Sequence, residues 1–585
     1  MSKRIRYLST FLLIAIMVFT IVNNYFWIKN NKFPPVGNSL QDLYPGINLY
    51  LDVTHHRVTL QKILDDWFKI LNLPEHCSID DNYIFYQFNI YPPLVPASFA
   101  LFYFLFGLHT GMELLVNTIY LVCAMLAIYG IGRKISNEKV GVLAVFIFSS
   151  FPGVISYSRF IFAEFNLMCL IAISLFFLLK TEFFTSRRYS IIFGIFLGLT
   201  ALTKWEFPLT MLAPCCLYLI YSQFTIKERT KSISTGRLWL NFSLAVCIGT
   251  LISLPWYLPS FKDIVSRCIY RSDFKCVPLD FPLIQKLSYL PLEIINWLIS
   301  VFYFLLLILS LISFVFIIFK RRKRLSQIKD ILFYAAFLSL WVIIPCLIGS
   351  YATFAASHIL PVLPAIAIMI SLGIFSFKNK VLRLILIFLT ILFGIGSYAH
   401  SFVNFGKYDL LYRLEIYVDQ NLSFNLTPNN YPDQPFEEVI SFYPPITADW
   451  KFNEILSYIK EDSYALKPSP TVLVLGENMW FGFDCFSFQY YNLIRNYGLF
   501  VEPKGNDRGE PTPDRSKFDY VVVKLPSFSA FNDIVLSEII NCTPNILEEY
   551  NIVELIKDFF KKYKFIKEYI LPDNAAVRIY KLINR

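Results

Sequence analysis

The sequence predicts a polytopic α-helical membrane protein that carries an α/β domain at its C-terminus. Its 585 residues are 56% hydrophobic and only 16% charged. Soluble globular chains average roughly 45–50% apolar and about 25% charged residues. The apolar residues gather in long runs that short basic clusters separate. Such runs favour spanning helices of about 20 residues over a membrane barrel, whose strands alternate in hydropathy.

Eleven apolar runs are long enough for spans, so the chain is expected to cross the bilayer about eleven times. They lie near residues 7–28, 110–132, 139–156, 161–179, 189–203, 206–223, 238–257, 292–319, 331–350, 359–377 and 382–400. The first run follows a basic start, as in a signal peptide. We interpret it as a retained helix, because it is over 20 residues long and no small-residue cleavage site follows it.

Basic residues indicate the orientation, because lysine and arginine in short loops stay on the cytoplasmic side. They outnumber acids in "SKRIR", "GRKISNEK", "KTEFFTSRR", "TIKERTKSISTGR", "KRRKRLSQIKD" and "KNKVLR". These segments alternate with the other loops, which predicts a cytoplasmic N-terminus and an outside C-terminal region. The net charge of +10 is therefore a signal of topology, and we expect no nucleic-acid partner.

Three parts follow from these runs: a membrane region at residues 1–404, an outside loop within it at residues 29–109, and a C-terminal domain at residues 405–585. In the loop, "VTLQKILDDWFKIL" places its large apolar residues on one helical face, which predicts a helix lying flat in the membrane interface.

The C-terminal region has the pattern of a small α/β domain. "PTVLVLG" and "FDYVVVKL" predict buried strands, and "YKFIKEYILPDNAAVRIYKL" predicts a hairpin. "TADWKFNEILSYIKED" has helical periodicity with Thr447 as its N-cap. Since "GEN" and not a glycine-rich loop follows the first strand, nucleotide binding has no support.

The eleven cysteines lie mostly in the apolar runs. Cys268 and Cys276 differ, because both fall in one predicted outside loop, eight positions apart. Whether they form a disulfide is left open by the sequence. No CxxC or Cys/His zinc spacing occurs.

Charged residues at the ends of spans are candidates for catalysis or binding. Burying a charged side chain near lipid costs free energy, so such residues usually have a function or an ion-pair partner. Asp52 lies in the first outside loop, Arg159 and Glu164 lie between the third and fourth spans, and Lys204 follows the fifth. The predicted topology places all four at one membrane face. The alternative is that they are interfacial anchors or snorkelling side chains.

All six histidines fall in the outside half of the predicted topology: His55, His56, His76, His109, His358 and His400. Their placement suggests a shared site for metal or phosphate. The alternative, a general preference of histidine for interfaces, is the favoured interpretation of His76, His109 and His400. Adjacent His55 and His56 cannot share one helical face, so we expect only one of them to reach a ligand.

Five motifs in order resemble the GT-C glycosyltransferases of family 39 type, which include protein O-mannosyltransferases and the lipid A aminoarabinose transferase. They are the acid Asp52, then "YPPL" (Tyr91, Pro92, Pro93 and Leu94), then Ser158, Arg159 and Glu164, then "GLTALTK" ending at Lys204, then "SHILPVLPAIAI". The resemblance covers roughly residues 1–400, and the outside C-terminal domain fits the aminoarabinose transferase layout.

The resemblance implies inverting transfer of a sugar from a polyprenyl-phosphate donor to an acceptor hydroxyl of a glycan, lipid or protein at the outer face. Asp52 would be the general base, and Glu164 would orient acceptor or sugar or help to hold a divalent ion. His56, Arg57, Arg159 and Lys204 would meet the lipid phosphate. Tyr91, Pro92 and Pro93 form a structural motif. No cofactor is certain, and a divalent metal is an open alternative, since Asp52 lacks the acidic neighbour of many relatives.

The chemical requirements of an inverting sugar transfer agree with these roles without reference to the family. Inversion needs a carboxylate to take the acceptor proton and cations to stabilise the departing phosphate. Four other acids share the first loop: we interpret Asp65 and Asp66 as the polar face of the interfacial helix, and Asp80 and Asp81 as a turn.

Two other functions remain as alternatives: a transporter or flippase of polyprenyl-linked glycans, and a non-catalytic membrane assembly subunit. A transporter predicts polar residues deep within its spans. A bacterial inner membrane is the expected location, and the endoplasmic reticulum is the alternative.

Overall fold

A computed structural model of the chain describes most of the membrane region and part of the C-terminal region. The described residues are 3–32, 43, 45–47, 49–50, 54, 92–108, 111–229, 235–270, 294–321, 325–352, 356–402, 445, 449, 451–463, 471–475, 500–502, 519–524, 561–571 and 576–583. The predicted interfacial helix, Asp52 and both members of the His55–His56 pair lie outside this set.

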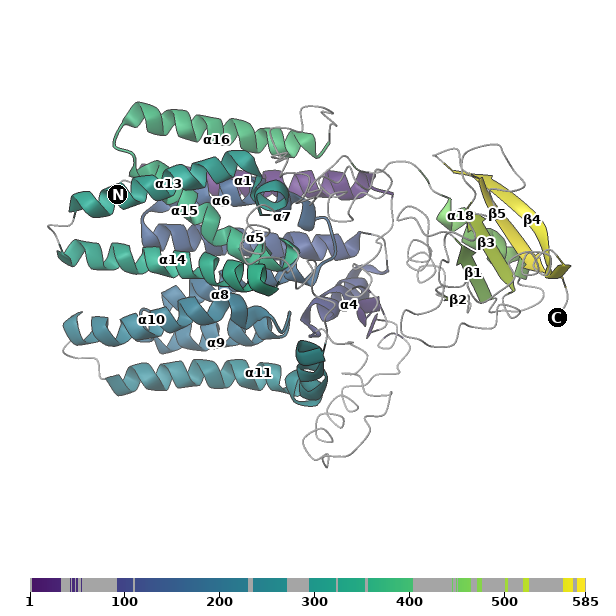
Figure 1. Ribbon diagram of the computed structural model, residues 1–585, viewed down its shortest axis with the longest axis horizontal. Coiled ribbons are helices and arrows are strands. Elements are labelled where there is room, and N and C mark those ends of the chain that lie inside the picture. The colour runs from purple at the N-terminus through teal and green to yellow at the C-terminus, as the bar shows by residue number, and fades with distance from the viewer. Residues whose placement is uncertain are drawn as a thin grey trace.

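The membrane region is a bundle of helices that lie along the long axis of the molecule (Figure 1). They are α1 (Lys3–Asn30), α4 (Leu94–Phe106), α5 (Met112–Ile135), α6 (Glu138–Ser150), α7 (Pro152–Tyr157), α8 (Ala163–Lys180), α9 (Arg187–Ala201), α10 (Phe207–Arg229), α11 (Thr235–Tyr270), η2 (Ile294–Ile299), α13 (Ser300–Arg321), α14 (Leu325–Ala352), η3 (Ala356–Val362), α15 (Leu363–Ser376) and α16 (Lys380–His400).

Each of the eleven predicted spans overlaps one of these helices. Among the described residues, eight helices are long and apolar enough to cross a membrane. The helices α6, with 13 residues, and α9, with 15, are shorter. The structure therefore supports a polytopic α-helical membrane protein, while the number of crossings stays a prediction.

The predicted span at 139–156 is broken between α6 and α7. Phe151 has an extended backbone (φ −61°, ψ 132°), and Pro152 begins α7. A residue that precedes proline is disfavoured in the helical region, because the proline ring collides with its backbone. The break redirects the chain toward the turn that carries Arg159 and Glu164.

Close helix contacts depend on small residues. A Cβ added to Gly194 in α9 would lie 2.5 Å from the Ala245 carbonyl oxygen in α11, and one added to Gly198 would lie 2.9 Å from the Gly249 carbonyl oxygen. Helices in lipid gain association energy from such close packing, because lipid supplies no hydrophobic drive between them. The α9–α11 pair thus forms a rigid support for the turn that follows α9.

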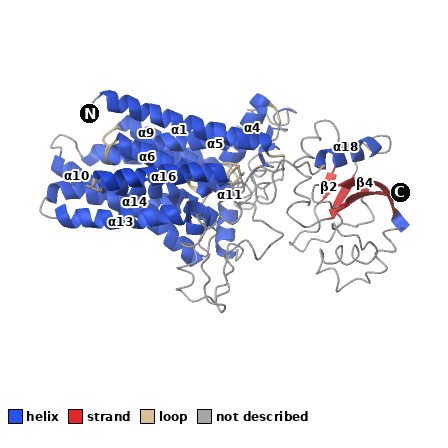
Figure 2. Ribbon diagram, turned by 90° about the horizontal axis from the view of Figure 1, so that it is seen from above, coloured by secondary structure: helices blue, strands red, loops and turns tan. Residues whose placement is uncertain are grey.

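A mixed five-stranded sheet occupies the C-terminal part, beyond the end of the bundle at which α4 and α7 lie (Figures 1 and 2). Its strands are β1 (Thr471–Leu475), β2 (Phe500–Glu502), β3 (Tyr520–Lys524), β4 (Tyr563–Ile570) and β5 (Ala576–Leu582), in the order β2-β1-β3-β5-β4. The two predicted buried strands are β1 and β3, which pair in parallel, and the predicted hairpin is the antiparallel pair β4–β5.

One sequence-based placement is wrong. The helix predicted to follow Thr447 begins only at Phe452 as α18 (Phe452–Ser463), because Lys451 before it has a positive φ of 63°. Helix α11 continues to Tyr270, past the end of its apolar span at Leu258, so the segment that carries Cys268 is helical. Cys276 lies outside the described residues.

Candidate active site

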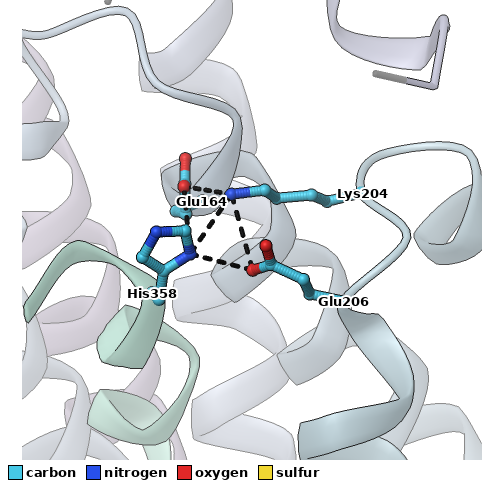
Figure 3. A network of polar contacts seen from close by, with 4 residues as sticks. All are labelled: Glu164, Lys204, Glu206 and His358. Atoms are coloured by element: carbon cyan, nitrogen blue, oxygen red, sulfur yellow. Dashed lines mark hydrogen bonds and ion pairs between the residues drawn. The ribbon is translucent and has the colours of Figure 1, made fainter. Parts of the chain in front are cut away.

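Three segments that are distant in the sequence meet at one end of the bundle. They are the first turn of α8, the turn between α9 and α10, and the short 3₁₀ helix η3. Each contributes ionisable side chains that point toward one another: Glu164 from α8, Lys204 and Glu206 from the turn, and His358 from η3 (Figure 3). We refer to these four residues as the ionic cluster.

Lys204 lies at the centre of the ionic cluster (Figure 3). Its ammonium group donates to Glu164 Oε1 and lies 3.5 Å from Glu206 Oε2. Nδ1 of His358 lies 2.9 Å from Glu206 Oε2, 3.5 Å from Glu164 Oε1 and 3.4 Å from Lys204 Nζ. The contacts engage one oxygen of each carboxylate, and ionised carboxylates can accept further hydrogen bonds through the other.

Three members of the ionic cluster are buried: Glu164 is 4% exposed, Lys204 1% and Glu206 7%, while the His358 side chain is 13% exposed. Burial by itself would raise the pKa of Glu206, but the charges of Lys204 and His358 and their hydrogen bonds lower it to about 2. Glu206 is therefore ionised at neutral pH.

Helix geometry explains why a carboxylate is stable at position 164. Glu164 lies in the first turn of α8, where backbone N–H groups and the helix dipole favour negative charge. The preceding turn is held by Asn117, whose Nδ2 donates to the Phe160 carbonyl at 2.8 Å. Asn166 Nδ2 in turn donates to Asn117 Oδ1 at 3.0 Å. This buried amide pair joins α5 to the start of α8 and fixes the direction of Glu164.

The turn that carries Lys204 is anchored on two sides. Tyr257 in α11 donates its hydroxyl hydrogen to the Ala201 carbonyl at 3.0 Å. The backbone N–H of Leu94 donates to the Leu202 carbonyl at 3.0 Å. Because Pro93 is the N-cap of α4, the predicted proline motif begins the helix that contacts this turn. Pro92, next to it, is buried.

The third segment, η3, is fixed by Trp341. The indole Nε1 of this α14 residue donates to the Pro361 carbonyl at 2.8 Å, and both the indole and the neighbouring Leu360 are fully buried. A tryptophan N–H buried without an acceptor is costly, so this bond selects the position of η3. His358, three residues earlier, is thereby held against the carboxylates.

Arg159 lies in the same turn as Glu164 but has different neighbours. Its Nε donates to Asn24 Oδ1 at 3.1 Å, and its Nη2 donates to Asn23 Oδ1. The guanidinium lies 5.3 Å from the centroid of the Trp27 ring and 5.8 Å from that of Phe402. Burial lowers the pKa of Arg159 to about 9, which leaves it charged at neutral pH. Nη1 is buried and has no hydrogen-bond partner among the described residues.

The structure thus joins two of the residues proposed from the sequence, Glu164 and Lys204, in one ion pair. Arg159 is placed against α1. Asp52, His56, Arg57 and Tyr91 lie outside the described residues.

Glu206 and His358 were missed as site residues by sequence reasoning. Both fall in segments that drew attention, "LTKWEF" and "SHILPVLPAIAI". The available signal for Glu206 was an acid two residues after Lys204 at the same membrane face. For His358 the signal was a histidine in a proline-rich segment between apolar runs. Nothing in the sequence showed that these segments meet.

The ionic cluster does not fit a divalent metal. Glu164, Glu206 and His358 are suitable ligand types, but the Lys204 ammonium lies among their donor atoms and would repel a cation. Among the described residues no group of three or more acids, histidines or cysteines could hold a metal ion. Here the positive charge between the two carboxylates is supplied by lysine.

Comparison with known proteins gives two similarities. Residues 91–252 match the family described as dolichyl-phosphate-mannose-protein mannosyltransferase, and this range contains Arg159, Glu164, Lys204 and Glu206. No curated protein sequence matches the chain.

The structure is similar to two crystal structures of ArnT from Cupriavidus metallidurans. For the form bound to undecaprenyl phosphate, the TM-score is 0.51 at 12% identity, and the alignment covers 97% of each chain. For the apo form the TM-score is again 0.51 at 12% identity, with 99% of this chain and 98% of the other covered. The likeness concerns the fold.

Proposed function

We propose that this chain, which has the fold of the GT-C membrane glycosyltransferases, transfers a sugar from a polyprenyl-phosphate donor to an acceptor hydroxyl. The observation that carries the proposal is the buried ionic cluster at the helix ends of a chain with this fold. ArnT of the same fold binds undecaprenyl phosphate, which supports a polyprenyl-phosphate donor here.

The reaction inverts the anomeric carbon. The acceptor oxygen forms a bond to that carbon, the bond from the carbon to the phosphate oxygen breaks, and polyprenyl phosphate leaves. Asp52 takes the acceptor proton as general base. Its place in the first outside loop and its match to the family's first acid support this role.

The described residues of the site supply hydrogen-bond donors for the leaving phosphate and acceptors for the sugar hydroxyls. Lys204, His358 and the unbonded Nη1 of Arg159 are donors that can stabilise the charge growing on the phosphate. Glu164 and Glu206 hold the Lys204 ammonium in position, and their second oxygens can accept hydrogen bonds from sugar hydroxyls. His56 and Arg57 add positive charge from the first loop.

The outer membrane face is the site of transfer in this proposal, with a glycan, lipid or protein as acceptor. The basic segments that favour a cytoplasmic N-terminus support this orientation. A bacterial inner membrane is the proposed location.

The test is a strain that lacks the protein, analysed by mass spectrometry of its envelope glycans and lipid-linked sugars. We expect one sugar decoration to disappear and its polyprenyl-phosphate donor to accumulate. Wild-type protein should restore the decoration and Asp52→Asn should not, whereas the matched controls Asp65→Asn and Asp66→Asn should. An unchanged glycan profile in the deletion strain would refute the function. Full restoration by a correctly inserted Asp52→Asn variant would refute only the role of the base.

A further inference from the structure

A large cavity lies between the membrane helices, well away from the ionic cluster. Its volume is about 1510 Å³, which exceeds the ~300–1,000 Å³ common for sites of drug-sized ligands. Its walls come from α1, α6, α13, α14, α15 and α16, together with the last residues of α5 and the short link between α5 and α6.

The cavity and the ionic cluster are at opposite ends of the bundle. Lys139, which lines the cavity, lies in the first turn of α6, whereas Glu164 follows the other end of α6 and the short α7. Lys134, also in the lining, forms an ion pair at 3.6 Å with Glu182, just beyond the far end of α8 from Glu164. The cavity is therefore no part of the candidate active site.

Positive charge is concentrated at one end of this cavity. Lys134 ends α5, Lys139 begins α6 and Arg383 lies in the first turn of α16. Asp330 is the acid in the lining, and its Oδ1 accepts a hydrogen bond from Tyr221 at 2.9 Å. Among the described residues neither Lys139 nor Arg383 has an ion-pair partner. Lys134 is paired with Glu182, so Lys139 and Arg383 against Asp330 leave this end with a net positive charge.

The remainder of the cavity is mostly apolar and runs along the helices. On α16 the lining extends from Arg383 to Ile391, and on α1 from Leu8 to Ile16. Eight residues of helix correspond to ~12 Å along the axis. The lining on α6 likewise runs from Lys139 to Phe146. A positive end at the helix termini and an apolar channel reaching into the membrane match a lipid with an anionic headgroup.

We propose that this cavity binds an anionic phospholipid, with its phosphate at Lys139 and Arg383 and its acyl chains along α1 and α16. The positive end selects against zwitterionic lipids, because each basic residue near a membrane surface contributes about 1 kcal/mol of attraction to anionic lipid. The basic segments place this end in the cytoplasmic leaflet. The bound lipid fills the space between α1, α15 and α16.

Native mass spectrometry of the full chain, delipidated in mild detergent, tests this site with phosphatidylglycerol and phosphatidylcholine as probes. We expect wild-type protein to retain phosphatidylglycerol preferentially. The double variant Lys139→Gln with Arg383→Gln should weaken that binding by roughly 10- to 30-fold. The matched control, Arg187→Gln with Arg188→Gln, removes two exposed charges near the same membrane face and should bind like wild type.

A second variant keeps the charges and fills the apolar channel. Ile387→Trp should reduce phosphatidylglycerol retention, because its indole occupies the space of an acyl chain. Equal retention of the two lipids by wild-type protein, or wild-type binding by both test variants, would overturn the proposal. Preference for added undecaprenyl phosphate over phosphatidylglycerol at Lys139 and Arg383 would also overturn it, by assigning the cavity to the donor lipid.

Discussion

Lys204 is the residue on which the candidate site depends most directly. It is 1% exposed, donates to Glu164 and lies 3.5 Å from Glu206, so its charge is confined between two acids. A buried lysine held in this way is positioned before substrate arrives. Preorganised charge of this kind supplies much of the transition-state stabilisation in enzymes.

We predict that Lys204→Met lowers transfer activity by a factor of about 10² to 10³, because the departing phosphate loses a fixed cation. The measurement is kcat on protein that elutes as a monodisperse peak, since removing one member of a buried ion pair also destabilises the fold by about 3–5 kcal/mol. Lys180→Met, at the other end of α8, is the control and should retain full activity. A Lys204→Met enzyme within about tenfold of wild type would contradict the assigned role.

The lowered pKa of Glu206 predicts that the stability of the protein depends on pH. Its pKa is lowered from 4.5 to about 2, so the carboxylate stabilises the fold above pH 4.5 and loses that contribution as the pH falls toward 2. At pH 7 the free energy of unfolding of the wild-type protein should therefore exceed that of Glu206→Gln by up to about 3 kcal/mol. The wild-type protein should accordingly unfold at a higher temperature. The difference should shrink below pH 4.5. Thermal unfolding of both proteins from pH 7 to pH 3 measures it, and a constant difference would exclude this linkage.

At the scale of elements, the site depends on how helix ends are held. Helix α9 ends just before Lys204, and its packing on α11 rests on Gly194, Gly198 and Gly249. The hydrogen bond from Tyr257 to the Ala201 carbonyl transmits that packing to the turn. A shift of α9 away from α11 would therefore move Lys204 relative to Glu164.

Gly194→Ala tests this dependence. The added Cβ would meet the Ala245 carbonyl oxygen at 2.5 Å, so the two backbones must separate. We expect a loss of about 1–3 kcal/mol in stability together with reduced activity. Ile195→Leu, on the neighbouring and more exposed position, serves as control for changes to the same helix. Unchanged thermal stability and activity in Gly194→Ala would show that the close contact is not required.

At the scale of the whole molecule, charge is divided between the two ends of the bundle. The ionic cluster lies at the end of the bundle where α4 contacts the turn between α9 and α10, and the C-terminal sheet lies beyond α4 (Figure 1). Lys134, Lys139 and Arg383 lie at the opposite end. This division agrees with a cytoplasmic N-terminus and with a candidate site that faces the outside, where a lipid-linked sugar would be used.

Cysteine labelling tests this orientation. A membrane-impermeant maleimide applied to intact cells without an outer barrier should label Lys564→Cys, which is exposed on β4. Lys139→Cys, exposed at the start of α6, should react only after the membrane is permeabilised. The native cysteines exposed on the bundle, such as Cys123, serve as the background in unmutated protein. Labelling of Lys139→Cys in intact cells would reverse the predicted topology.

The sequence by itself determined the class of fold and two residues of the ionic cluster, Glu164 and Lys204. Long apolar runs must become helices in lipid, because backbone polar groups there have no water to bond, so each predicted span overlaps a helix. Topology then placed Glu164 and Lys204 at one face, and the structure joins them in an ion pair. The local rule that residues before proline leave the helical region would also have indicated the break at Phe151.

Only the tertiary structure decided which charges are partners. Glu206 and His358 are separated by 152 positions in the sequence, and the contact between them arises because the start of α10 and the helix η3 both lie near the start of α8. Arg159 lies only five positions from Glu164, yet its side chain contacts α1. There the side-chain oxygens of Asn23 and Asn24 accept its hydrogen bonds, and the Trp27 ring makes a cation–π contact with its guanidinium. The hydropathy of a span determines that it crosses the membrane, but it does not determine which helices the span packs against. Those depend on side-chain packing between helices, which no single run of residues contains.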